Sequence, residues 1–339
     1  MRATTRRVFG SAALALALSP ARRIAAPAAA QPAPGAVPTP GTLRLIVPAA
    51  PGGGWDGTAQ AIGRVLRETG TVERVAFEYL PGAGGAAALP RVVTGLRGQD
   101  GTLMVGGLTL VSSPIVTQSA LTVLDTVPIA RLEGEPLVVA VRADAPLRTA
   151  EDFARALKAD PLGLSVAGGS EGSADHILLA VIAQSLGTDA AGLNYVPLGG
   201  GGPAAEAVLG GRARAGISNW SEFAPHIEAG RMRALALSGD ARHVGLDVPT
   251  LRETGIDAVL YNWNGVFAPP GIETEQQGRL EAMIEAMVRS PAWEQELARS
   301  RWRSLYLPRR EFEAFLRTEM RSTERILGQL GLSQPRRSD

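Results

Sequence analysis

Four glycine-rich loops are the parts of this chain best suited to chemistry, and each joins a short apolar strand to a helix start. They are P-G-G-G at 51–54, P-G-A-G-G at 81–85, A-G-G-S-E-G-S at 167–173 and L-G-G-G-G at 198–202. The first amide N–H groups of a helix have no partner within it, and the helix dipole favours negative charge there. Glycine lets a ligand approach these groups closely. The loops therefore predict a site that holds a small anion with backbone rather than with charged side chains.

Several side chains next to these loops could add to the site. Trp55 could close over an apolar part of a ligand or pack beneath its loop, and Asp56 is placed to cap the helix that follows. Ser170 and Ser173 can donate hydroxyl hydrogen bonds beside the free N–H groups. His176, in the first turn of a helix predicted over 174–186, could donate to a carboxylate or be a partly buried polar residue.

An enzyme remains an alternative reading of the third loop. G-G-S-E-G at 168–172 fits the G-x-S-x-G string of a hydrolase nucleophile, which needs a histidine and an acid from later in the chain. His226 and His243 are available, so an exported hydrolase using Ser170 stays open.

Cofactors and metals are not predicted. Gly82-x-Gly84-x-x-Ala87 is only a loose match to the dinucleotide fingerprint, and Asp100 lies in a polar turn instead of ending a second strand. The chain has no cysteine, and its three histidines lack the i, i+4 spacing of a helical zinc pair.

The first thirty residues indicate export. Residues 1–30 combine paired arginines at 6–7, a short apolar stretch and small residues around Ala30, which is typical of a signal peptide of the twin-arginine kind. We expect cleavage near Ala30, a flexible leader over 31–41 and a periplasmic mature protein. Residues 1–30 contain five arginines and no acid, so their removal leaves a mildly acidic chain, for which nucleic-acid binding is not expected.

The rest of the 339 residues is long enough for two domains and alternates strand and helix signals from Thr42 onward, which indicates an α/β fold with parallel sheets. We expect a buried strand over 103–111 and crossing strands over 137–141 and 264–268, with only helices after Pro270. The sequence also predicts a helix over 58–69 with Ala61, Ile62, Val65 and Leu66 on one apolar face, a helix start at Thr149-x-x-Asp152 that resembles a capping box, and a helix with Pro203 as its first residue. The crossing strands predict a first lobe over 41–136 and 263–332 and an inserted second lobe over 137–262, with the ligand cleft between them.

The order of these motifs resembles the extracytoplasmic receptors of tripartite tricarboxylate transporters, the TctC/Bug type. The matching strings cover nearly all of the mature chain: L-I-V-P-A-A-P-G-G-G-W-D at 45–56, L-P-G-A-G-G at 80–85, A-G-G-S-E-G-S-A-D-H at 167–176, D-V-P-T-L-R-E-T-G at 247–255 and N-G-V-F-A-P-P-G at 264–271. The resemblance implies a two-lobed periplasmic-binding-protein fold of type II. It also implies a non-catalytic receptor that closes on a small carboxylate, such as citrate or a related di- or tricarboxylate, and hands it to membrane permease subunits.

The resemblance and the loops together give the expected ligand-binding residues. They are Gly53, Gly54, Trp55, Asp56, Gly82, Ala83, Gly84, Gly85, Thr109, Gly169, Ser170, Ser173, His176, Gly200, Gly201 and Asn219. No catalytic residue, metal or cofactor belongs to this expectation. A monomer suffices, and a receptor for a membrane sensor kinase is the alternative partner reading.

Two positions depart from the family pattern. The fourth loop reads L-G-G-G-G where many relatives carry a lysine before the glycines, and Asn264 stands where an arginine is common in the tricarboxylate branch. Both losses of positive charge put citrate itself in doubt as the ligand.

Overall fold

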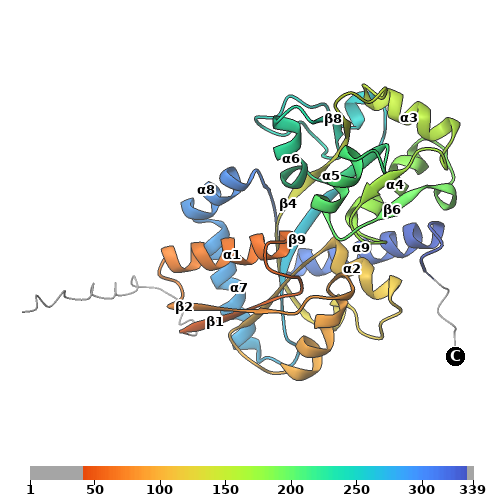
Figure 1. The fold of residues 1–339 in the computed structure, drawn as a ribbon. Helices are drawn as coiled ribbons and strands as arrows, with labels where there is room; N and C mark the ends of the chain where they lie inside the picture. Colours follow the sequence, from red (N-terminus) through yellow and green to blue (C-terminus); the bar gives the residue numbers. More distant parts are fainter. Residues whose placement is uncertain (1–40, 334–339) are drawn as a thin grey trace, which may run out of the picture.

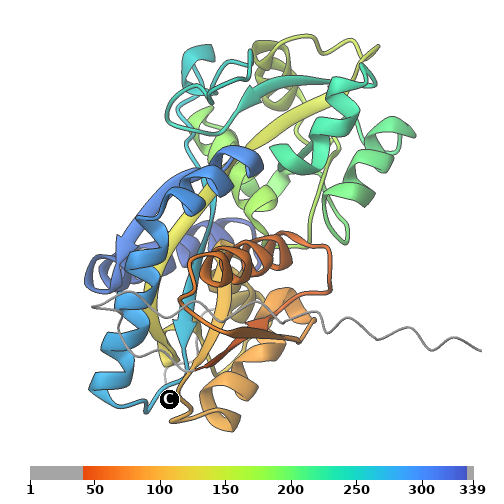
Figure 2. The ribbon, with the colours of Figure 1, turned by 90° about the vertical axis from the view of Figure 1, so that its left-hand side faces the viewer.

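Alternating apolar strands and amphipathic helices build two lobes, each a sheet covered by helices (Figures 1 and 2). The structure is a computed structural model that describes residues 41–333. The predicted signal peptide over 1–30 and, except for Gly41, the leader predicted over 31–41 lie outside the described residues. The arrangement confirms the predicted α/β fold with two lobes.

The first lobe contains most of the strands. Its sheet consists of β1 (Thr42–Val47), β2 (Arg74–Tyr79), β3 (Thr102–Gly107), β9 (Tyr261–Ala268), the first part of β4 (Val127–Arg142) and β10 (Arg303–Pro308). β1, β2 and β3 are parallel, whereas β9 runs antiparallel to both β3 and β4. The carboxyl ends of the parallel strands therefore meet at one edge, where an α/β sheet usually binds its ligand.

Helices follow these strands and cover the sheet. They are α1 (Gly54–Glu68), the short helices η1 (Ala83–Ala88) and η2 (Arg91–Gly95), α2 (Leu108–Val116), η3 (Val123–Asp125), α7 (Thr274–Val288), α8 (Pro291–Ser300) and α9 (Arg309–Gln329). On α1 the apolar face that the sequence predicts is buried, with Ile62 and Leu66 fully enclosed.

The second lobe has a smaller sheet. It contains the end of β4 with β5 (Val166–Gly168), β6 (Tyr195–Pro197), β7 (Ala215–Asn219) and β8 (Met232–Leu237), covered by α3 (Ala150–Ala159), α4 (Ala174–Ser185), α5 (Gly201–Leu209) and α6 (Trp220–Glu228), with η4 (Ala190–Gly192) and η5 (Arg252–Thr254) in its connections. α3 begins with the capping box that the sequence indicates, since the Thr149 hydroxyl accepts from the Asp152 amide and the Asp152 carboxylate accepts from the Thr149 amide.

β4 joins the lobes as one strand. Its residues to Pro136 pair with β9 in the first sheet, and its residues from Leu137 pair with β7 and β8 in the second (Figure 2). The chain returns just before β9, where the Leu260 amide donates to the carbonyl of Ser238. We retain the division into 41–136 with 263–332 and 137–262 as a proposal.

Three local predictions were wrong. The strand predicted over 103–111 ends at Gly107, and α2 begins at Leu108, because the apolar run Leu108–Val111 is buried equally well as a helix. The region after Pro270 is not purely helical, since β10 pairs with β4 at a sheet edge. Pro203 is the third residue of α5 rather than the first.

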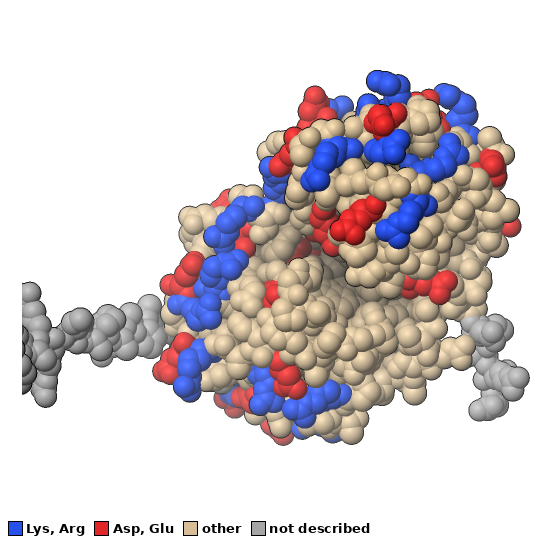
Figure 3. Space-filling model, viewed as in Figure 1, with Lys and Arg blue, Asp and Glu red and all other residues tan. Residues whose placement is uncertain are grey.

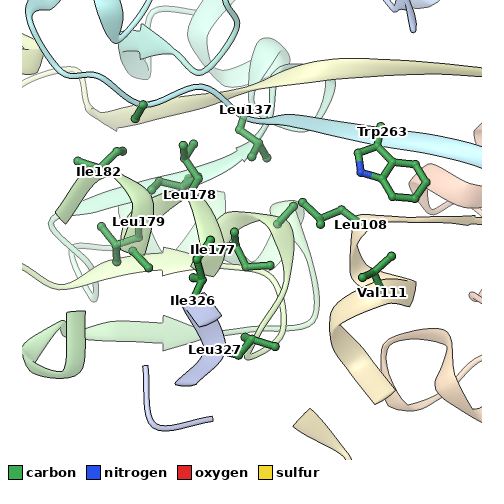
Figure 4. Packing of buried hydrophobic residues seen from close by; sticks show 14 of the residues in the cluster. Leu108, Val111, Leu137, Ile177, Leu178, Leu179, Ile182, Trp263, Ile326 and Leu327 are labelled. Carbon is green, nitrogen blue, oxygen red and sulfur yellow. The ribbon is translucent and has the colours of Figure 1, made fainter. Parts of the chain in front are cut away.

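One apolar cluster extends across both lobes. Figure 4 shows Leu108 and Val111 of α2 with Leu137 of β4 and Ile177 of α4, all buried. The end of α9 lies beside α4, and Leu327 in its last turn is fully buried. The last helix of the chain therefore packs against the inserted lobe.

Replacing Leu327 by alanine should reduce the free energy of unfolding by roughly 2–5 kcal/mol, because it removes a fully buried side chain and leaves a cavity. Urea denaturation followed by circular dichroism measures the change. Leu162→Ala is the matched control, since the Leu162 side chain is 69% exposed and its truncation should change little. Equal effects of the two substitutions would contradict this packing.

A buried carboxyl group lies close to the crossing point. Glu133 of β4 is fully buried, and its Oε1 accepts from the hydroxyl of Thr58 at 2.9 Å and from the side-chain amide of Asn264 at 2.9 Å. Its Oε2 has no partner among the described residues. Burial raises the pKa of Glu133 to about 7, although the two hydrogen bonds oppose that shift.

Glu133→Gln should therefore stabilise the protein increasingly as the pH rises. In the wild type the folded state holds a proton on Glu133 more tightly than the unfolded chain does. The stability that this proton contributes to the wild type is complete below pH 4.5 and is lost as the pH rises through about 7. Relative to the wild type, the variant should gain about 2–3 kcal/mol between pH 5 and pH 8. Urea midpoints across this range measure the gain, and the exposed Glu68→Gln is the control. A difference that does not change with pH would contradict the buried, titrating carboxyl group.

Candidate functional site

The glycine loops of both lobes meet around one cavity of about 360 Å³, which we call the loop cavity. Figure 3 shows the hollow between the lobes as largely uncharged surface with acidic atoms at its upper edge. The lining of the loop cavity includes twelve of the residues predicted from the sequence, and Gly199 beside them. The twelve are Trp55, Gly82, Ala83, Gly84, Gly85, Thr109, Gly169, Ser170, Ser173, Gly200, Gly201 and Asn219. Segments from four separate parts of the chain therefore converge on one space.

The loop after β2 lines the cavity in a backbone conformation that favours glycine. Gly82, Gly84 and Gly85 all have positive φ, a conformation that favours glycine, and Ala83 shares it with a φ of 49°. The hydroxyl of Ser113 fixes the loop by donating to the carbonyl of Gly84 at 2.9 Å. A side chain at Gly84 would bring its Cβ within 2.8 Å of Ser113, so the close packing requires glycine.

Trp55 forms a wall of the cavity rather than only a support beneath its loop. It lines the loop cavity and also packs against the apolar clusters of the protein. Its ring lies so close to Gly85 that a Cβ there would come within 2.7 Å of it. Trp55 therefore both faces the space for a ligand and packs beneath its loop, the two positions that the sequence left open.

Asp56 shapes the first loop from inside α1. The helix begins at Gly54 with Gly53 as its cap residue, so Asp56 is not the N-cap that the sequence predicts. Its carboxylate instead reaches back to accept from the amide of Gly52 at 2.7 Å and from the hydroxyl of Tyr79 at 2.8 Å. Burial acts to raise the pKa of Asp56, but these hydrogen bonds outweigh it and lower the pKa. Asp56 does not line the cavity.

On the second lobe, carboxylates of the protein itself occupy two of the loop N–H groups. The amide of Gly169 donates to Asp175 at 2.6 Å, and the amide of Gly201 donates to Glu222 at 3.1 Å. Glu222 also accepts from the hydroxyl of Ser218 at 2.6 Å. Burial, with a contribution from the charge of Glu222, raises the pKa of Asp175 to about 7.

Asp175 and Glu222 line the cavity and were not among the predicted residues. Each lies in the first turn of its helix, α4 or α6, where acidic residues are common because they face the positive end of the dipole. That position was the available signal, and in the sequence it indicates a helix start more readily than a binding residue.

His176 does not line the loop cavity. Its ring stacks on Tyr195 with ring centres 3.9 Å apart, and its Nδ1 accepts from the amide of Gly172 at 3.2 Å. Burial lowers the pKa of His176 to about 4, so the ring is neutral at physiological pH. It supports the third loop from behind.

Two asparagines join the ends of β7 and β9 at the edge of the cavity. Asn262 of β9 donates to the side-chain carbonyl of Asn219 at 3.0 Å, and both residues line the cavity. This bond leaves the NH₂ group of Asn219 available as a donor beside Gly54, where a Cβ would lie 3.9 Å from it.

A second, larger cavity of about 770 Å³ adjoins the first and shares Trp55, Asn219 and Glu222 with it. Gly53, Gly54 and Asn264 line this side cavity, together with Arg299 and Arg301 of the α8 end. We take the loop cavity as the candidate ligand site despite its smaller volume, because the glycine loops of both lobes meet there. The side cavity extends from it between α1 and α6.

The geometry that the alternative hydrolase reading requires is not formed among the described residues. His243 uses its ring nitrogens on the backbone carbonyls of Val244 and Arg301, and neither His226 nor His243 lines the cavity with Ser170. Over residues 41–333 no hydrogen bond joins the Ser170 hydroxyl to a histidine.

Residues 41–333 contain no cluster of three or more histidine, aspartate or glutamate side chains placed to hold a metal ion. None of the helices described in this range is long and apolar enough to span a bilayer.

Comparison with known proteins places the chain in one family. Residues 67–332 match the tripartite tricarboxylate transporter family receptor, TctC. The protein BugT of Bordetella pertussis (strain Tohama I) is 29% identical over 259 residues, which is 74% of this chain and 77% of that protein. The crystal structure of a TctC solute-binding protein from Polaromonas is 28% identical, covers 86% of this chain and 98% of its own, and has a TM-score of 0.66.

A further structure is MatC from Rhodopseudomonas palustris with bound malate. It is 25% identical, covers 84% of this chain and 98% of its own, and has a TM-score of 0.69. The match spans most of the described residues, the fold agrees and the cavity lies between the lobes. This chain therefore belongs to the tripartite tricarboxylate transporter receptor family, whose members are solute-binding proteins and not enzymes.

Proposed function

We propose that this protein is an extracytoplasmic receptor that binds a small carboxylate in the loop cavity and delivers it to the permease subunits of a tripartite tricarboxylate transporter. The observation that carries the proposal is the convergence of glycine loops from both lobes on one cavity. Membership of the receptor family and the malate in MatC support it. The hydrolase hypothesis for Ser170 is abandoned, because the family consists of solute-binding proteins.

The contacts available are sufficient for useful affinity. A micromolar dissociation constant corresponds to about 8 kcal/mol. Hydrogen bonds to a charged group contribute about 1.5–3 kcal/mol each, and a helix N-terminus adds up to about 2 kcal/mol. A carboxylate held by the loop at 82–85 and the start of α2 can reach this range, even after the cost of association.

Location and partners follow from the same proposal. A receptor of this family would act in the periplasm, with the signal peptide over 1–30 directing export, and a monomer remains our prediction. Ligand contacts from both lobes would favour a closed state that the permease can distinguish from the open one.

Thermal unfolding of the purified protein with a panel of mono-, di- and tricarboxylates tests the proposal. A ligand that binds only the folded state adds about 2.7 kcal/mol at a concentration one hundred times its Kd, which should raise the Tm by roughly 5 °C. At least one acid should give a saturable shift, whereas a panel without any shift would reject the carboxylate receptor.

Gly84→Val should weaken binding of the acid found in that panel by about 100-fold, because the new side chain displaces the loop from Ser113 and from the ligand. Isothermal titration calorimetry measures the change.

Gly70→Val is the matched control. Gly70 has a φ of 67°, close to the 59° of Gly84, but it lies in the turn after α1 with open space around it. Both variants carry the same kind of backbone strain, so only Gly84→Val should lose affinity. Equal affinities would show that the loop does not hold the ligand.

A further inference from the structure

The loop cavity is electrically asymmetric. The residues that the first lobe contributes to its lining carry no charge, and they include Trp55, the loop at 81–85 and Thr109. The second lobe contributes two acidic residues, Asp175 and Glu222. The lining contains no lysine or arginine. One end of the cavity therefore offers hydrogen-bond donors, and the other end offers the acidic side chains of Asp175 and Glu222 as acceptors.

The first lobe is the end suited to a carboxylate. The loop at 82–85 and the start of α2 present backbone N–H groups, and Thr109 adds a hydroxyl. No carboxylate of the described residues accepts a hydrogen bond from Gly82, Ala83 or Gly84. These groups remain available for the anion of a ligand.

In the second lobe, the loop amides of Gly169 and Gly201 already donate to carboxyl groups of the protein. The amides of Gly169 and Gly201 donate to Asp175 and Glu222, so a ligand carboxylate placed there would lose these donors and meet like charge. Glu222 is exposed and lies where the loop cavity joins the side cavity. It is placed to accept from a ligand.

The two arginines near the cavity do not offset the acidic side chains of its lining. Arg299 and Arg301 line only the side cavity, where Arg299 pairs with Glu296 and Arg301 pairs with Glu228 at 3.0 Å. A second ligand carboxylate would therefore have no free cation at either end of the loop cavity.

We infer that the ligand carries one carboxylate, held by the first lobe, and a hydrogen-bond donor such as an amine or hydroxyl at its other end, which Glu222 accepts. The inference rests on the proposed function and narrows its ligand class. Glu222 is then the residue that selects against a second carboxylate.

A series of acids with matched chains tests this directly. Calorimetry compares 4-aminobutanoate, 4-hydroxybutanoate, succinate and tricarballylate, which differ in the group opposite one carboxylate. We expect at least one of the first two acids to bind the wild type roughly tenfold or more tightly than succinate, and tricarballylate to bind most weakly.

Glu222→Gln should remove this preference. Glutamine can still accept from the amide of Gly201 and bond to Ser218, so the loop is retained while the charge is lost. The ratio of succinate affinity to 4-aminobutanoate affinity should rise at least about tenfold. Glu206→Gln is the control, because Glu206 is exposed on α5 of the same lobe and lies outside both cavities.

The outcomes separate the inference from the proposed function. Succinate or tricarballylate binding the wild type as tightly as the amino and hydroxy acids would overturn the inference and leave a carboxylate receptor in place. Equal effects of Glu222→Gln and Glu206→Gln on the affinity ratio would also overturn the inference. The same holds if neither 4-aminobutanoate nor 4-hydroxybutanoate binds while another carboxylate does. If no carboxylate of the whole thermal panel binds, the proposed function fails as well.

Discussion

The amide N–H groups at the helix starts around the cleft each need an acceptor, and the character of the site depends on which acceptor each group finds. A buried donor without a partner is costly, so it must be satisfied by the protein, by water or by a ligand. In the second lobe Asp175 and Glu222 fill this role for Gly169 and Gly201. In the first lobe the loop at 82–85 has no such internal carboxylate. Asp56 fills the same role for Gly52 in the first lobe, so this kind of junction serves as structure at Gly52, Gly169 and Gly201 and as a binding surface at 82–85.

The fold could be predicted from the sequence where periodicity and turn chemistry agree. The alternation of strands and helices, the capping box at Thr149 and the crossing near Leu137 are all present in the structure. The prediction failed at Leu108, because a fully buried helix and a buried strand have the same apolar composition. It also failed for β10, whose pairing with β4 depends on tertiary contacts that no local pattern reports.

The site was predictable as a set of loops but not as an electrostatic pattern. Glycine spacing identified the loop at 82–85 and those that meet it, because close approach to backbone requires this residue. The functions of Asp56 and Glu222 depend on which amide each carboxylate reaches, and that is fixed only when the helix is placed against its loop. His176 shows the converse, since a polar residue beside a glycine loop faces Tyr195 instead of the cavity.

The continuity of β4 also bears on the order in which the chain can fold. Pro136 of β4 lies opposite Tyr261 of β9, and Val127 lies opposite Ala268, so the whole second lobe separates these partners in sequence. Closing so long a loop is entropically costly unless the intervening chain is already compact. The inserted lobe, a single stretch of chain, brings the two strands together once it has folded. We therefore expect destabilising substitutions confined to the second lobe to delay completion of the first sheet, which is built almost entirely from other parts of the chain.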